Sequence, residues 1–380
     1  MARVNRREVL SEDEVQVVHC INRCVRRGFL CGMDPVSGQD YEHRRQWIRN
    51  RLEFLAGVFG VEVTGFAVMS NHFHVVLRTR PDVVAGWSDE EVARRWWQLF
   101  PLRRNQDGSA AEPAETDLNA IINDAATLEE RRKRLSSVSW FMRCMSEVIA
   151  RMANAEDECT GRFWEGRFKA QVLPDEEAIA ACMVYVDLNP VRAGLAETPE
   201  DSEFTSVQER VADLKSAEQI SDDSVQLSEH GAKSAAEQAP SSALRAPSPP
   251  QGRRDTVDAR VEHGPRAGWL APVELDPKRK KVREESNPRR ATNKGCLPMT
   301  LAEYLQLVDW TGRQLHPGKR GVISENAPPV LERLGTSEEL WLHTVKKFGR
   351  TRAVTTMRSG DNVTAVGSNR KRSVKLASPA

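Results

Sequence analysis

The chain has 380 residues, enough for two domains of the usual size, and its 55 lysines and arginines nearly balance 54 aspartates and glutamates. The net charge of +1 does not indicate a class of binding partner, because basic and acidic residues gather in different stretches. No run near the N-terminus has signal-peptide character, and none elsewhere approaches the roughly 20 apolar residues of a membrane span. We therefore expect a soluble cytoplasmic protein with no membrane partner.

Cysteine usage agrees with a reducing compartment. Of the 7 cysteines, Cys20, Cys24 and Cys31 lie near one another but lack a second Cys or His pair at metal-finger spacing. We expect reduced structural thiols.

The first part of the chain alternates between strand and helix patterns. Strands are expected at 15–24, 61–69, 72–79 and 161–173, and helices at 41–60, 140–156 and 175–189. Residues from about 81 to 135 look like an insertion of helix and polar loop. The order predicts an α+β fold, a ferredoxin-like antiparallel sheet with helices on one face, over residues 1–213.

The second part changes in composition. Residues 214–265 are rich in Ser, Ala, Gln and Pro and should form a disordered linker. Residues 266–358 predict a small basic helical module, in which Thr300 and Glu303 form a capping box and short helices follow at 327–335 and 337–349. Residues 359–380 predict a basic disordered tail.

Two histidines in the expected strand at 72–79 could bind a metal ion. His72 and His74 are two residues apart, so the period of a strand sends both imidazoles to one face, while Phe73 points to the other. Surface histidines are the plainer interpretation, because a metal site needs at least a third ligand.

A tyrosine and an asparagine late in the same domain add to the pattern. Tyr185 and Asn189 are four residues apart and would lie on one helical face, with an oxygen of Asn189 as a third ligand and the phenol within reach of a phosphate. The alternatives are a core tyrosine and a helix that stops before Pro190.

Sequence blocks in this order resemble a known family. The blocks are INRCVRRGFL, MSNHFHVVL, GRFWEGRFKAQVL and YVDLNPVRAGL. Together they resemble the REP-associated tyrosine transposase branch of the single-tyrosine HUH transposases, over roughly residues 14–210. The insertion, the linker and the C-terminal region have no counterpart in the minimal catalytic domain of that family.

The resemblance implies an activity and its residues. It implies that His72, His74 and Asn189 hold a divalent ion, Mg²⁺ or Mn²⁺, and that Tyr185 is the nucleophile. The implied reaction nicks and rejoins single-stranded DNA at hairpin-flanked sites through a 5′-phosphotyrosine intermediate, in a monomer or a homodimer. A hairpin-binding regulator without cleavage, and a phosphodiesterase in which water attacks, are the alternatives.

Basic residues near these blocks are candidates for DNA contact. Arg162, Arg167 and Lys169 alternate with aromatic residues, a mixture that suits single-stranded DNA, although an aromatic core strand with a basic edge would look the same. Arg192 could clamp a phosphate or simply face solvent. The basic cluster at 278–281 and the tail could add salt-sensitive affinity.

Overall fold

A computed structural model of the protein describes residues 10–25, 30–35, 37–214, 266–275 and 287–315, with two short strands at 355–356 and 364–365. The long strands are β1 (Val17–Arg23), β2 (Val61–Val68), β3 (His72–Thr79) and β4 (Lys169–Leu173). The helices before β4 are α1 (Arg44–Val58), α2 (Pro81–Val84), α3 (Asp89–Leu99), α4 (Glu115–Ile122), α5 (Ala125–Leu135) and α6 (Val138–Glu156). After β4 come α7 (Glu176–Asp187), α8 (Asn189–Arg192) and α10 (Leu301–Leu315), and residues 206–214 are also helical.

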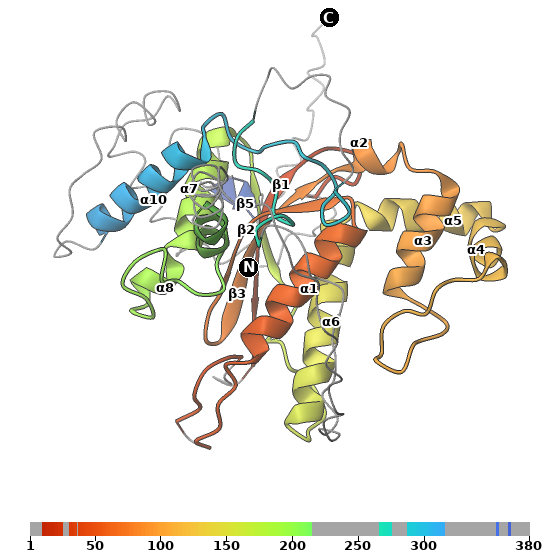
Figure 1. Ribbon diagram of the computed structural model, residues 1–380, viewed down its shortest axis with the longest axis horizontal. Coiled ribbons are helices and arrows are strands. Elements are labelled where there is room, and N and C mark those ends of the chain that lie inside the picture. Colours follow the sequence, from red (N-terminus) through yellow and green to blue (C-terminus); the bar gives the residue numbers. More distant parts are fainter. Residues whose placement is uncertain are drawn as a thin grey trace, which may run out of the picture.

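The four long strands form an antiparallel sheet in the order β2-β3-β1-β4 (Figure 1). β1 pairs with both β3 and β4, and β2 pairs with β3. Beyond β4, the two-residue strands β5 (Thr355–Thr356) and β6 (Thr364–Ala365) continue the sheet. The register sets Arg23 opposite His72, so the side chains of these two residues lie on one face. The mixed α+β class expected from the sequence is confirmed.

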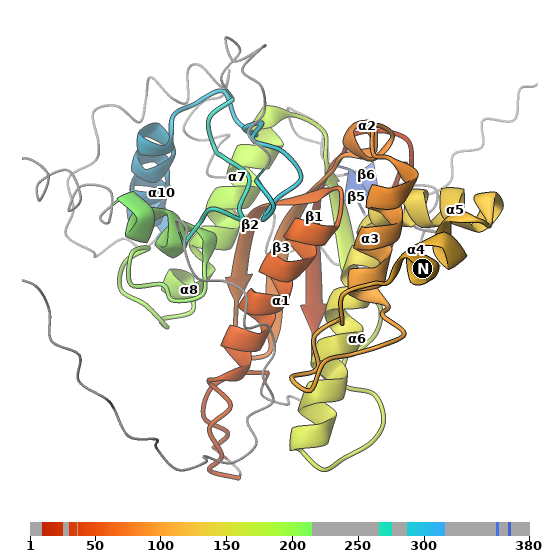
Figure 2. The same ribbon diagram turned by 45° about the vertical axis from the view of Figure 1, so that its right-hand side comes forward.

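Helices cover both faces of the sheet, not one face as the sequence analysis expected (Figure 2). One apolar core joins α1 and α6 to strand residues such as Phe73 and Val75. A second core joins α7 and α10 to residues of the opposite face, among them Val76 and Leu173. The expectation of one covered face was wrong. Almost every residue of β2 and β3 is buried, which requires helices on both faces of the sheet.

The inserted helices α2 to α5 lie at the opposite side of the molecule from α7 and α10 (Figures 1 and 2). They pack against the core of α1 and α6 through Val92, Trp97 and Leu128. Local caps explain where two of them begin, since Ser88 accepts from the backbone N–H of Glu91 and Asp124 from that of Thr127.

The described C-terminal residues complete the core of the first 214 residues. Trp269, Tyr304 and Trp310 are at most 2% exposed. α10 lies along α7, and its expected capping box is present, because Thr300 and Glu303 exchange two side-chain to backbone hydrogen bonds. The expected helices at 327–335 and 337–349, the basic cluster at 278–281 and almost all of the linker and tail lie outside the described residues.

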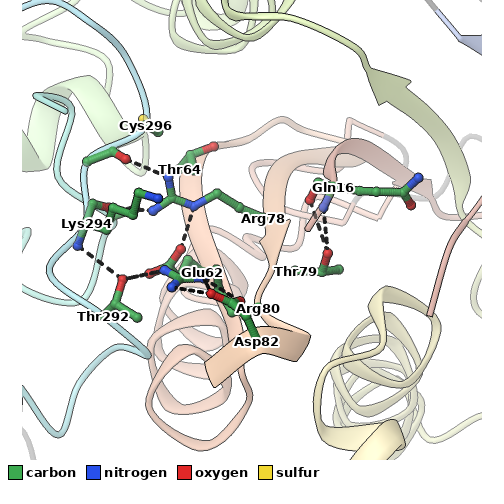
Figure 3. A network of polar contacts seen from close by, with 12 residues as sticks. Gln16, Glu62, Thr64, Arg78, Thr79, Arg80, Asp82, Thr292, Lys294 and Cys296 are labelled. Carbon is green, nitrogen blue, oxygen red and sulfur yellow. Dashed lines mark hydrogen bonds and ion pairs between the residues drawn. The ribbon is translucent and has the colours of Figure 1, made fainter. Parts of the chain in front are cut away.

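A buried polar network fastens this C-terminal segment to the sheet (Figure 3). The Glu62 carboxylate is fully buried and accepts from the Arg78 guanidinium at 2.6 Å. Arg78 also donates to the carbonyls of Lys294 and Gly295, and Arg80 donates to the Thr292 hydroxyl at 2.8 Å. Each buried charge therefore has an opposite charge or several hydrogen-bond partners, as buried ions require.

Candidate active site

The two histidines of β3 lie on the face that α7 covers. Their ring centroids are 4.9 Å apart, and Phe73 between them enters the opposite core, as the strand period predicts. His74 is 3% exposed, whereas His72 is partly exposed at the start of the strand. His72 Nδ1 is 2.6 Å from Asn71 Oδ1, an atom that can only accept, so Nδ1 carries the proton and Nε2 keeps its lone pair.

A third histidine, which the sequence analysis missed, completes this cluster. His19 of β1 is 2% exposed, and its Nε2 atom lies 2.9 Å from His74 Nδ1. The two rings are stacked, with centroids 5.2 Å apart and planes 13° apart. The strand pattern around His19 was visible in the sequence, but the β1–β3 register was needed to bring it to His74.

Tyr185 of α7 points toward these imidazoles. Its ring centroid lies 5.7 Å from that of His74 and 6.1 Å from that of His19. α7 starts at an Asp175 cap, which accepts from the N–H of Ala178, and it is buried on both sides by the sheet and α10. Tyr185 as a whole is 8% exposed, so its phenol lies in the interior beside the histidines.

Asn189 and Arg192 reach Tyr185 from the next short helix. α7 ends at Asp187, so Asn189 begins α8 rather than continuing α7 as expected; Pro190, which lacks a backbone N–H, suits that start. The Asn189 side chain still approaches the phenol closely enough to lower its pKa. The guanidinium carbon of Arg192 lies 4.9 Å from the centre of the Tyr185 ring.

Burial keeps the histidines neutral. It lowers the pKa of His19 to about 3, and burial with the charges of Arg23 and Lys169 lowers the pKa of His72 to about 4. The pKa of His74 is also lowered well below its usual value, first by burial. Neutral imidazoles are the form that can ligate a metal ion.

The phenol and the guanidinium influence each other. Burial raises the pKa of Tyr185, and the nearby charge of Arg192 opposes that rise. Burial in turn lowers the pKa of Arg192 to about 10, with the phenol opposing. A cation held over the ring therefore favours the phenolate.

The other basic candidates divide into two groups. Lys169 begins β4 and, with Arg23, lies close enough to lower the pKa of His72, whereas Arg162 and Arg167 are exposed in the loop before the strand. That loop replaces the first part of the strand expected at 161–173. Of its aromatic residues, Trp164 and Phe168 belong to the apolar core, and Phe163 is partly buried against that core.

Several buried polar atoms in and beside this cluster have no hydrogen-bond partner among the described residues. They are His74 Nε2, Gln171 Nε2, Asn189 Nδ2, and Nε and Nη2 of Arg192. Gln171 pairs with His19 across the β1–β4 ladder, which puts both side chains on one face. Buried polar atoms are normally satisfied, so these atoms are open to contacts with a further group.

Three side chains of the cluster have atoms of types that can bind a divalent ion. Nε2 of His72 and His74 can offer lone pairs, and the Asn189 amide can offer an oxygen. In the described part of the chain no cluster of three or more His, Cys, Asp and Glu could hold a metal, and this donor set contains only two such residues. The third ligand would be the amide.

Comparisons with known proteins add little. No protein-family model matches the chain, and no curated protein matches it. Among solved structures, the chain is similar to a REP-associated tyrosine transposase bound to a REP hairpin, with 11% identity and a TM-score of 0.30. That match covers 52% of this chain and 79% of the other. Within the described residues, none of the helices has the length and apolar character to span a bilayer.

Proposed function

We propose that the protein nicks and rejoins single-stranded DNA, with Tyr185 as nucleophile and a divalent ion held by His72, His74 and Asn189. The observation that carries the proposal is the approach of the Tyr185 ring to within 5.7 Å of the His74 ring, between centroids, at a site with unsatisfied buried polar atoms. A nucleophile and a metal site must meet at one phosphate for this chemistry.

Each residue has a task in the reaction. Bound Mg²⁺ or Mn²⁺ would draw charge from the scissile phosphate. Arg192 favours the phenolate of Tyr185, whose oxygen attacks phosphorus. A bond forms between the Tyr185 oxygen and phosphorus, the bond from phosphorus to the 3′ oxygen breaks, and that oxygen takes up a proton. The products are a 5′-phosphotyrosine and a free 3′-hydroxyl.

Rejoining is the reverse step. A DNA 3′-hydroxyl attacks the phosphotyrosine, and the Tyr185 phenol leaves. One phosphodiester is exchanged for another of similar energy, so no nucleotide cofactor is required. Such an exchange suits a transposase that acts at hairpin-flanked sites in the cytoplasm.

The rest of the architecture agrees with this proposal. The strand order β2-β3-β1-β4 with antiparallel neighbours supports the proposal of a ferredoxin-like sheet, and α7 covers the face that carries the histidines. Lys169 and Arg192 would meet the DNA backbone at the centre, while Arg162 and Arg167 would contact it from the exposed loop. His74 and Tyr185 belong to one chain, so a monomer would have a complete centre.

An adduct assay tests the proposal. The full chain is incubated with labelled single-stranded hairpin DNA and Mn²⁺, and a denaturation-resistant protein–DNA adduct is expected. Tyr185→Phe should abolish it, whereas Tyr41→Phe, a surface change of the same kind, should not. His74→Ala should abolish cleavage and leave much of the DNA binding.

Other outcomes identify the alternatives. Binding without any adduct or cleavage would indicate a hairpin-binding regulator. Cleavage that survives Tyr185→Phe would indicate a phosphodiesterase in which water attacks.

A further inference from the structure

The proposed chemistry gives His19 no role, although its ring lies against that of His74. The 2.9 Å contact joins His19 Nε2 to His74 Nδ1, and both residues are at least 97% buried. Two buried nitrogens at this distance share a hydrogen bond, because water cannot reach them. The direction of that bond decides which nitrogen of each neutral ring carries the proton, and so the state of His74 Nε2.

One direction of this hydrogen bond suits a cation at His74, whereas the other direction blocks it. Between two neutral imidazoles, one nitrogen donates and the other accepts. If His19 donated, His74 would carry its proton on Nε2, a buried atom with no acceptor among the described residues. If His74 donates from Nδ1, its Nε2 atom keeps a lone pair that can bind a cation.

The neighbouring histidine shows the same arrangement. His72 donates its Nδ1 proton to Asn71 Oδ1, which leaves its own Nε2 free to ligate. Histidines that bind metals commonly donate the other ring proton to an acceptor, which fixes the orientation and tautomer of the ring. His19 would accept the Nδ1 proton of His74 in the same way that Asn71 accepts the Nδ1 proton of His72.

We propose that His19 is a positioning residue that accepts the Nδ1 proton of His74 and thereby presents the Nε2 lone pair of His74 to a divalent ion. The cation at Nε2 rests on the proposed function, whereas the direction of the hydrogen bond can be measured without metal.

Nuclear magnetic resonance of ¹⁵N-labelled histidine in the full chain, without metal or DNA, tests the hydrogen bond. His74 should carry its proton on Nδ1. His19→Phe keeps a stacked ring but offers no acceptor, so the Nδ1 tautomer should no longer dominate, while His19→Gln, with an amide oxygen near the place of Nε2, should restore it. A wild-type proton on Nε2, or a tautomer unchanged in the Phe variant, would overturn the proposal.

Calorimetric titration with Mn²⁺ alone tests the consequence. His19→Phe should weaken Mn²⁺ binding roughly 10- to 100-fold, and His19→Gln should recover most of the loss. His43→Gln is the matched control, because His43 is half-exposed and pairs with Glu156 on the other helical layer. Unchanged affinity in folded His19→Phe would refute the proposal. A wild-type chain that binds no Mn²⁺ would refute the metal-dependent function, and the tautomer would still decide the role of His19.

Discussion

The substitution Tyr304→Phe removes the hydroxyl that ties α10 to α7. That hydroxyl donates to Asp187 Oδ2 at 2.6 Å, and both side chains are fully buried. A hydrogen bond to a charged group contributes roughly 1.5–3 kcal/mol. Because phenylalanine fills nearly the same volume, we expect the free energy of unfolding to fall by about 2 kcal/mol, with little change in packing.

The size of this loss should depend on pH. Burial raises the pKa of Asp187, and the Tyr304 hydroxyl is among the groups that oppose the rise. Since the folded pKa lies above the unfolded one, the stability from protonated Asp187 is present at low pH and is lost as pH rises through the folded pKa. Without the Tyr304 hydroxyl the folded pKa of Asp187 rises further. The variant therefore loses stability over a wider span of pH than the wild type does. The difference between wild type and variant should therefore grow from acid toward neutral pH.

Urea unfolding at several pH values measures both effects. Tyr41→Phe is the control, because its hydroxyl donates to Gln39 at the surface, and we expect a change within about 0.5 kcal/mol. If Tyr304→Phe were no more destabilising than this control, or if its effect did not vary with pH, the assignment of a charge-assisted bond to Asp187 would be wrong.

Two further changes probe the C-terminal segment and the nucleophile. A Cβ at Gly295 would lie 1.7 Å from the backbone oxygen of Glu274, so Gly295→Ala should cost about 3 kcal/mol or more in thermal unfolding; Gly166→Ala, with open space around it, should cost far less. Arg192→Met removes the cation that lowers the pKa of Tyr185, so adduct formation should slow and its pH profile should move to higher pH; an unchanged profile would contradict that role.

Local patterns in the sequence were enough for most of the sheet and its helices. Alternation predicted β1, β2 and β3 within a few residues, and the spacing of His72 and His74 predicted their common face. The strand expected at 161–173 was too long, because Trp164 turns into the core and contacts the end of β1 through an isolated bridge to Cys24. Alternation of apolar and polar residues in the sequence looks the same for a single bridge of this kind and for a continuous strand.

His19 shows what local patterns leave out. Its own segment reads as a strand with one histidine, which is equally typical of a surface position. Its partner His74 is 55 residues away, and only the β1–β3 register brings the two rings together. Gln171 was missed for the same reason, because its place beside His19 depends on the β1–β4 register.

The C-terminal segment was harder to foresee, because charged residues hold it. Arg78 and Glu62 are charged residues of strands, yet both are buried, and Arg78 donates to the backbone carbonyls of Lys294 and Gly295. Once this segment is in place, α10 covers the outer side of α7 while the sheet covers the inner side. The helix that carries Tyr185 is thus packed on two sides within one chain, and the phenol faces the histidines of its own sheet.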